Sequence, residues 1–238
     1  MQQFLDKQKK INVIDLGMID YEKALIIQEK LLKLRKENRI DDIILILEHK
    51  PVITIGKRGK ESNILASSEF LAEKGVNVCN AGRGGDVTYH GPGQIIGYPI
   101  MRFQNYVSGV RELVRNIEEI FVHLLGECYN IRAGRDPEHP GVWVGNDKIT
   151  AVGLLISSGV TMHGFAFNVN TDLTAFQWIL SCGITGKGVT SIKKIMSEEQ
   201  DISKVKEQVV QYFGQIFDVK PCWKELKDLN KILELYNE

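Results

Sequence analysis

The stretch that most constrains the fold is "AGRGGDVTYHGPGQIIGYP", residues 81–99. Its centre, "DVTYH", contains Val, Thr and Tyr, which favour a β-strand. Glycines bracket this short run on both sides: Gly84, Gly85, Gly91 and Gly93. Glycines at such places mark either tight turns or a close approach of another backbone or a ligand. Two interpretations stay open: a hairpin whose glycines serve turns, or the thin wall of a cleft for a long, slim substrate, with Arg83 and His90 at its ends.

Hydrophobic periodicity predicts strands and helices along the first half of the chain. Strands are expected at 11–17, 76–82 and 94–101, and in two apolar runs within 42–59 that are separated at Pro51. Helices are expected at 21–39, 67–75 and 107–129. Asp20 is expected to be the N-cap of the first helix.

From Gly141 to residue 170 the pattern changes to three β-rich runs, separated by Gly-Asn-Asp and Ser-Ser-Gly turn signals. These runs predict an antiparallel meander, with Lys148 just after its first turn. The remainder reads as mostly helical, around 204–217 and 223–236. We predict one α+β domain over residues 1–238, with its motifs within about 40–195 and a C-terminal helical part at 200–238.

Charge and hydropathy argue against several classes of function. Thirty basic residues balance thirty acidic ones, whereas nucleic acid and anionic membranes favour proteins with a positive surface. The beginning of the chain lacks the apolar region of a signal peptide, and no segment approaches the roughly 18 apolar residues that a membrane helix needs. We therefore expect a cytoplasmic protein.

The sequence does not indicate a metal or a nucleotide site. Its cysteines, at 79, 128, 182 and 222, form no Cys-x-x-Cys pair, and its histidines show no His-x-x-x-His spacing. His90 and His163 are therefore interpreted as structural histidines. "GRGGDV" lacks the third glycine of a dinucleotide fingerprint, and "GITGKGVTS" has Gly188 where a P-loop needs Ser or Thr. We expect no cofactor.

Cys182, in "ILSCGITGKG", is a candidate nucleophile, because the glycine that follows it leaves room for a substrate. The alternative is a small buried side chain, which is the ordinary role of a cysteine. A nucleophilic thiol needs a base, and partial burial can lower the pKa of a lysine enough for that role. Lys148 is the candidate; as an ordinary turn residue it would instead be solvated.

Four ordered motifs together resemble one family. "RGGDVTYHGPGQIIGYP", "GVWVGNDKITAVGL", "HGFAFNVNTDL" and "SCGI" resemble the lipoyl(octanoyl) transferases, which are octanoyl-[acyl-carrier-protein]:protein N-octanoyltransferases. The resemblance implies transfer of octanoate from octanoyl-acyl carrier protein to a lysine of a lipoyl domain, in 2-oxoacid dehydrogenase complexes and in the glycine cleavage H protein. It also implies a mixed, largely antiparallel sheet with flanking helices, as in the catalytic domains of biotin and lipoate protein ligases.

The resemblance also assigns roles to residues of this chain. Cys182 would carry the acyl group as a thioester, and Lys148 would lower the pKa of that thiol. Three segments match the substrate-binding ones of the family: Arg83, Gly84, Gly85, Asp86, Val87, Thr88, Tyr89 and His90; Ala151, Val152 and Gly153; Gly164, Phe165 and Ala166. Departures occur at Asp86, Thr150 and Ser181, where the family often has Gln, Ala and Pro; they put substrate preference and rate in question.

Three other functions remain to be distinguished by experiment. An ATP-dependent lipoate-protein ligase would need ATP and no thiol, so its activity would survive loss of Cys182. An amidotransferase would take the octanoyl group from another lipoyl-accepting protein. A non-catalytic binding module would need neither Cys182 nor Lys148. For the carrier protein, which is acidic as a class, the sequence offers a basic loop: Lys57, Arg58 and Lys60.

Overall fold

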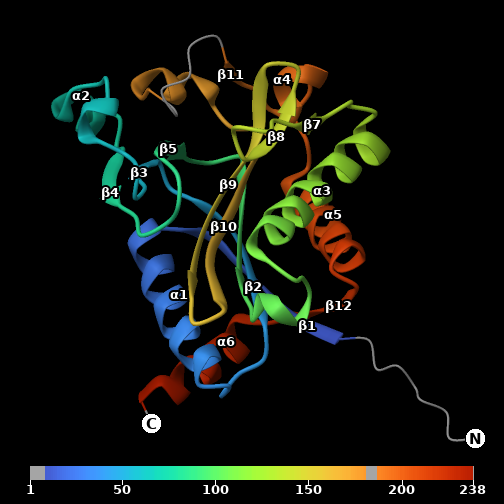
Figure 1. Ribbon diagram of the computed structural model, residues 1–238. Coiled ribbons are helices and arrows are strands. Elements are labelled where there is room, and N and C mark those ends of the chain that lie inside the picture. Colours follow the sequence, from blue (N-terminus) through green and yellow to red (C-terminus); the bar gives the residue numbers. More distant parts are fainter. Residues whose placement is uncertain (1–8, 181–186, 238) are drawn as a thin grey trace, which may run out of the picture.

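The computed structural model of the chain describes residues 9–180 and 187–237. Within these ranges a large central sheet lies beside a smaller one (Figure 1). The large sheet contains, in spatial order, β12 (Val219–Lys224), β1 (Lys9–Ile19), β2 (Ile43–His49), β6 (Gln94–Ile100), β10 (Val160–Asn168), β9 (Asp147–Ser157), β8 (Gly141–Val144) and β7 (Gly134–Arg135), and β11 (Gly188–Val189) also pairs with β9. The pairs of β1 with β12 and β2, and of β9 with β11, are parallel, and the others are antiparallel. This arrangement confirms the predicted α+β class and mixed, largely antiparallel sheet.

Strand β2 shows why the sheet is covered on both faces. Its sequence, "IILILEH", is apolar without alternation, which is typical of a strand buried on both sides. Successive side chains point to opposite faces, so Ile44 and Ile46 join one hydrophobic core, while Ile43, Leu45 and Leu47 join another.

Helices cover the two faces in pairs (Figure 1). α3 (Val110–Tyr129) and α5 (Ile202–Ile216) pack on one face, and α1 (Tyr21–Lys36) and α6 (Leu226–Glu234) pack on the other. The apolar side chains of α3 recur at helical spacing and enter the first core: Leu113, Ile117, Phe121 and Leu124. α3 begins after Gly109, somewhat later than predicted, and ends at Asn130 in the left-handed conformation that commonly terminates helices.

The smaller sheet contains β4 (Asn77–Asn80), β3 (Val52–Ile55) and β5 (Val87–His90), in that spatial order. It packs with α2 (Ser68–Glu73) and the 3₁₀ helix η3 (Leu173–Trp178) around a third apolar cluster. β5 is the predicted "DVTYH" strand, and the Gly-Pro-Gly turn after it leads directly into β6 of the large sheet. The turn therefore places the edge of the small sheet against the middle of the large one.

Two features differ from the sequence analysis. β12 was not predicted: Pro221 interrupts its pattern and the strand lies at the sheet edge, where proline is tolerated. The segment expected to be mostly helical thus contributes a strand, besides α5 and α6. Asp20 is the N-cap residue of α1, but its side chain makes no capping hydrogen bond; instead its carboxylate contacts Lys50 and Lys23, at 3.0 and 3.4 Å.

Within residues 9–180 and 187–237, no helix combines the length and the apolar character that crossing a bilayer requires.

Candidate active site

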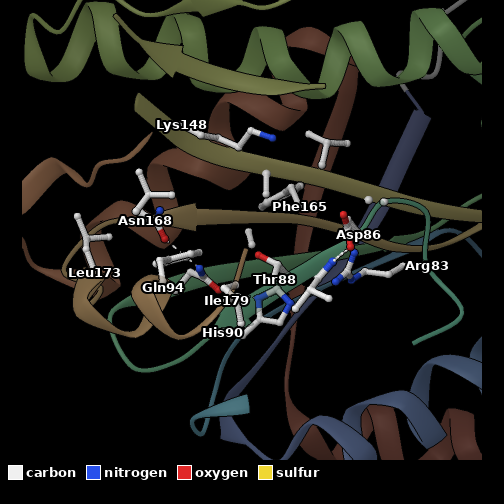
Figure 2. A pocket seen from close by; sticks show the side chains of 18 of the residues that line it. Arg83, Asp86, Thr88, His90, Gln94, Lys148, Phe165, Asn168, Leu173 and Ile179 are labelled. Carbon is white, nitrogen blue, oxygen red and sulfur yellow. Dashed lines mark hydrogen bonds between the residues drawn. The ribbon is translucent and has the colours of Figure 1, made fainter. Parts of the chain in front are cut away.

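A cleft of about 570 Å³ lies between the edge of the small sheet and the strands β9 and β10. One wall is the loop from Arg83 to Asp86 together with β5, and the other is formed by β9 and β10 (Figure 2). The 3₁₀ helix η3 and the residues of β11 complete the rim. The cleft thus combines segments that are far apart in sequence, and most of them were quoted above as motifs.

The glycines of the opening stretch have different roles. Gly84 and Gly85 line the cleft, and the Gly84 N–H donates to the Leu154 carbonyl of β9 at 3.0 Å. A Cβ on Gly153 of β9 would lie 3.0 Å from the Gly84 carbonyl oxygen, so the two backbones approach closely there. Gly93 instead serves the turn, since its φ is +79° and a Cβ would lie 2.7 Å from the backbone of Asn170. The stretch does not form a hairpin, because β5 pairs with β3 whereas β6 pairs with β2 and β10. Gly93 serves a turn and Gly84 and Gly85 line a cleft, and a long, slim substrate in that cleft stays a prediction.

Arg83 is buried in the wall of the cleft by hydrogen bonds to Thr54 of β3. Its Nη2 donates to the Thr54 carbonyl at 2.7 Å and to Oγ1 at 2.8 Å, and its Nε donates to the same Oγ1 at 3.2 Å. Asp86 is held by Asn63, whose amide donates to both carboxylate oxygens at 3.0 and 3.2 Å. The wall therefore carries a fixed cation and a fixed anion.

Aromatic and imidazole rings form a polar cluster at one end of the cleft. Tyr98 Oη and His49 Nε2 lie 2.7 Å apart, and His90 Nδ1 lies 2.7 Å from Gln94 Oε1. The His49 ring is 5.3 Å from that of Tyr21 and 5.9 Å from that of His90, and Tyr98 packs edge-on against His163 at 6.1 Å. Within the described ranges Tyr21 Oη and His163 Nε2 are buried without a hydrogen-bond partner, and both residues line the cleft.

Burial holds these histidines in their neutral form. Burial lowers the pKa of His49 to about 4. Burial, together with the charges of Arg83 and Lys57, also lowers the pKa of His163 to about 4. Burial also lowers the pKa of His90 well below its usual value, and the charges of His49 and Arg83 add to the effect. Among the described residues no group of His, Cys, Asp and Glu side chains is arranged to hold a metal ion.

Lys148 stands near the beginning of β9, and its side chain extends across the cleft (Figure 2). Its Nζ donates to the Pro140 carbonyl at 3.1 Å and lies 4.8 Å from the ring centroid of Trp143. The residue is half-buried. Its amine is thus fixed on one side by a carbonyl and a ring, and directed toward the cleft on the other.

Cys182 falls within residues 181–186, outside the described part of the chain, as does Ser181. The residues on both sides of this segment line the cleft. Before it, the Leu180 N–H donates to the Asn63 carbonyl at 2.7 Å. After it, Gly188 and Val189 pair with Asp147 and Lys148. The chain thus enters the segment at the rim beside Asn63 and leaves it beside Lys148.

The structure brings most of the predicted substrate-binding residues to this one cleft. Those that line it are Arg83, Gly84, Gly85, Asp86, Val87, Thr88, His90, Ala151, Val152, Gly153, Gly164, Phe165 and Ala166. Tyr89 does not: because side chains alternate along β5, it packs on the opposite face, with its ring 5.7 Å from that of Phe176. Sequence reasoning missed Tyr21, which lies outside the quoted motifs and reaches the cleft through packing. It also gave no role to Trp143, which lines the cleft and lies within the second quoted motif.

Comparison with known proteins identifies the family. Residues 20–214 match the model of the lipoyl protein ligase A/B catalytic domain. The octanoyltransferase of Desulforamulus reducens is 50% identical over 224 residues, which is 94% of this chain and 98% of that protein. The octanoyltransferase of Dictyoglomus thermophilum is 43% identical over 235 residues, covering 95% of this chain and 99% of that one.

Solved structures share the fold at much lower sequence identity. LipL1 of P. falciparum in complex with lipoate superposes with a TM-score of 0.73 at 15% identity, covering 95% of this chain and 71% of that one. Lipoate-protein ligase A bound with ATP gives a TM-score of 0.70 at 14% identity, with 97% and 95% coverage. The matched domain and the two highly similar relatives agree with the cleft and its motifs: the chain belongs to the lipoyl protein ligase A/B catalytic domain family and, within it, to the octanoyltransferases.

Proposed function

We propose that this protein transfers an octanoyl group from octanoyl-acyl carrier protein to a lysine of lipoyl domains, through a thioester on Cys182. The observation that carries the proposal is the connection between the two reactive residues. Lys148 faces the cleft, and the segment that contains Cys182 is continuous with β11, which pairs with β9 at Lys148 itself. A nucleophile and its base must lie within hydrogen-bonding reach, and this pairing limits how far apart they can be.

The cleft suits a slim apolar chain. Its walls combine glycine backbone at Gly84, Gly85 and Gly153 with the apolar side chains of Phe165 and Ile179. Ligand pockets of this kind are mostly apolar, with a few polar groups that fix orientation. The octanoyl chain would lie along this wall, with its thioester carbonyl at the end where Lys148 extends.

The reaction follows as two acyl transfers. The Lys148 amine takes the proton of the Cys182 thiol, and the thiolate attacks the donor thioester. The tetrahedral intermediate expels the carrier thiolate, which receives its proton from the Lys148 ammonium. The neutral acceptor lysine then attacks the acyl-enzyme and loses a proton to Lys148. The Cys182 thiolate that is expelled takes that proton from the Lys148 ammonium, which regenerates the free thiol. Because a thioester is already activated, neither half-reaction requires ATP.

The proposal also covers the acceptor proteins and the cellular compartment of the enzyme. The acceptors would be the lipoyl domains of 2-oxoacid dehydrogenase complexes and the glycine cleavage H protein, where the lysine must reach the rim of the cleft. The enzyme would act in the cytoplasm, where reducing conditions keep Cys182 a free thiol.

Intact-mass spectrometry after mixing the protein with octanoyl-acyl carrier protein tests the proposal. We expect one octanoyl adduct on Cys182, removable by hydroxylamine and transferable to a lipoyl domain without ATP. The Cys182→Ala variant should form no adduct, whereas Cys222→Ala should react normally. An adduct on another cysteine would refute the assigned nucleophile. Activity that needs ATP and survives Cys182→Ala would instead identify an ATP-dependent ligase, and transfer only from octanoylated proteins an amidotransferase.

A further inference from the structure

Trp143 of β8 contacts two lysines. The Nζ atoms of Lys148 and Lys187 each lie 4.8 Å from the centroid of its ring. The two ammonium groups are therefore separated by no more than twice that distance. The ring itself is fixed, since Trp143 is buried and its indole N–H donates to the His139 carbonyl at 3.1 Å. A cation over an indole ring is a stabilising contact, so Trp143 holds both side chains in place.

Asp136 holds Lys187 from the other side. The Lys187 ammonium donates to a carboxylate oxygen of Asp136, and the two side chains are 25% and 21% exposed. The other carboxylate oxygen accepts the backbone N–H groups of Glu138 and His139, both at 2.9 Å. These interactions, with that of Lys187 the largest, lower the pKa of Asp136 to about 2. The carboxylate therefore remains ionised wherever the enzyme works.

We propose that the Asp136–Lys187 pair is a positioning unit for Lys148: held against Trp143, it presents two opposite charges that nearly cancel at the Lys148 amine. The inference rests on the proposed function, in which Lys148 must both take up and give back a proton. A lone cation at Lys187 would destabilise the Lys148 ammonium. A lone anion at Asp136 would stabilise the ammonium and hinder its loss of a proton. With both charges present, Lys148 can exist as the neutral amine and as the ammonium.

Charge–charge distances make this effect measurable. At the greatest separation that the two ring distances allow, two unit charges still interact appreciably at the dielectric found near a protein surface. Removing one member of the pair should therefore shift the apparent pKa of Lys148 by roughly 0.3 to 1.3 units at that separation.

Other charged groups surround Lys148 and contribute to its titration. Glu118 of α3 is buried beside Arg135 of β7, and its own pKa is affected by the charge of Lys148. The remaining charged groups that line this cleft are Arg83, Asp86, Asp147, Lys187 and Lys194. All of these except Lys187 stay unchanged in the variants below, so the comparison isolates the pair.

The test is the pH dependence of Lys148 acetylation by a trace of acetic anhydride, followed by peptide mass spectrometry on the full-length protein. Lys187→Gln leaves the Asp136 charge uncompensated, which stabilises the Lys148 ammonium and should raise its apparent pKa. Asp136→Asn leaves the Lys187 charge uncompensated and should lower the apparent pKa of Lys148. The double variant removes both charges, so the apparent pKa of Lys148 should be close to the wild-type value. Lys187→Arg keeps the pair and should titrate like the wild type.

A matched control is Glu199→Gln, which breaks a lysine–carboxylate contact of 2.5 Å with Lys193, outside the cleft lining; it should leave the titration of Lys148 unchanged. Shifts in the same direction for Lys187→Gln and Asp136→Asn, or no shift in either, would overturn the inference. The readout needs no turnover, so it is distinct from the proposed function. If Lys148→Ala retained full transfer activity, the proposed function would fail, while the titration would still decide on the pair.

Discussion

Val189 is the register partner of Lys148 in the parallel pairing of β11 with β9, and the Thr190 N–H donates to the Lys148 carbonyl at 2.9 Å. The backbone of the lysine is thus joined to the chain that follows the "SCGI" motif. Such a ladder fixes the spacing of two segments more firmly than side-chain contacts do, because each backbone bond restricts both chains. It supports a shared role for the two segments in one reaction.

We predict that Lys148→Ala slows both half-reactions by about 10² to 10⁴, the usual size of general acid–base catalysis. Lys148→Arg should not restore turnover, because an arginine with a pKa above about 12 cannot cycle its proton. Rapid-quench measurement of acylation and deacylation checks both variants, with circular dichroism to establish that they are folded. Near-native turnover of the arginine variant would leave Lys148 a purely electrostatic role.

The buried histidines predict a loss of stability in acid. His49 and His163 have pKa values of about 4 in the folded protein, against about 6.5 when unfolded. The unfolded chain therefore binds more protons between these values, and stability falls as pH drops from 6.5 toward 4, by roughly 2 kcal/mol for each histidine at pH 5. Urea unfolding at pH 7, 6 and 5 measures this.

His163→Asn should weaken that pH dependence. His163 has a φ of +57°, a left-handed conformation that asparagine tolerates better than most residues. The variant lacks the buried imidazole, so acidification should cost it less free energy of unfolding than it costs the wild type. Equal losses in the two proteins would show that His163 takes up no extra proton on unfolding.

Thr150 of β9 offers a test of stability. Its side chain is fully buried, and within the described ranges its Oγ1 has no hydrogen-bond partner. Replacing the hydroxyl by a methyl group in Thr150→Val removes an unsatisfied polar atom at nearly constant shape. We expect the free energy of unfolding to rise by about 1 kcal/mol. A lower free energy of unfolding, measured by urea denaturation, would indicate that a water molecule forms a hydrogen bond with the hydroxyl in the wild type.

The basic loop after β3 is expected to guide the acyl carrier protein. Lys57, Arg58 and Lys60 are exposed, and the backbone N–H groups of the first two donate to the Arg83 and Gly85 carbonyls, at 3.1 and 3.0 Å. The loop therefore lies directly behind the cleft wall. Reversing these charges should raise the Michaelis constant for the carrier protein several-fold at low salt and less at high salt.

Lys231→Glu is the control for this experiment. Lys231 lies on α6, at the other end of the molecule from the small sheet (Figure 1). Its reversal changes the net charge without changing the rim of the cleft. An equal effect of both reversals would show that only the overall charge matters.

The sequence predicts those parts of the fold whose signals are local. The apolar run of β2 and the turn signals around β9 identify strands because burial and tight turns restrict residue choice there. β12 escapes prediction because Pro221 and two lysines mask its pattern, and its pairing with β1 depends on residues some two hundred positions away. In the site, the motifs locate Arg83, Lys148 and the glycines.

The remaining site residues depend on tertiary packing. Tyr21 enters the cleft because α1 packs across β6 and β10, and Lys187 meets Trp143 only through the path of the chain after residue 186. A sequence motif specifies which segments meet, whereas strand alternation decides which side chains face the cleft. This is why Tyr89, although within the motif, faces the other way.

The parallel pairing of β1 with β12 has a consequence for how the chain is made. Residues 9–14 of β1 cannot pair with β12 until residues 219–224 have left the ribosome. Until then, a strand near the beginning of the chain presents an unpaired edge, which is a template for aggregation. Contacts of such long sequence separation also slow folding. The nascent protein therefore completes its sheet only after residues 219–224 have been made, and a truncation shortly before Val219 should be prone to aggregate even though it keeps the described residues that line the cleft.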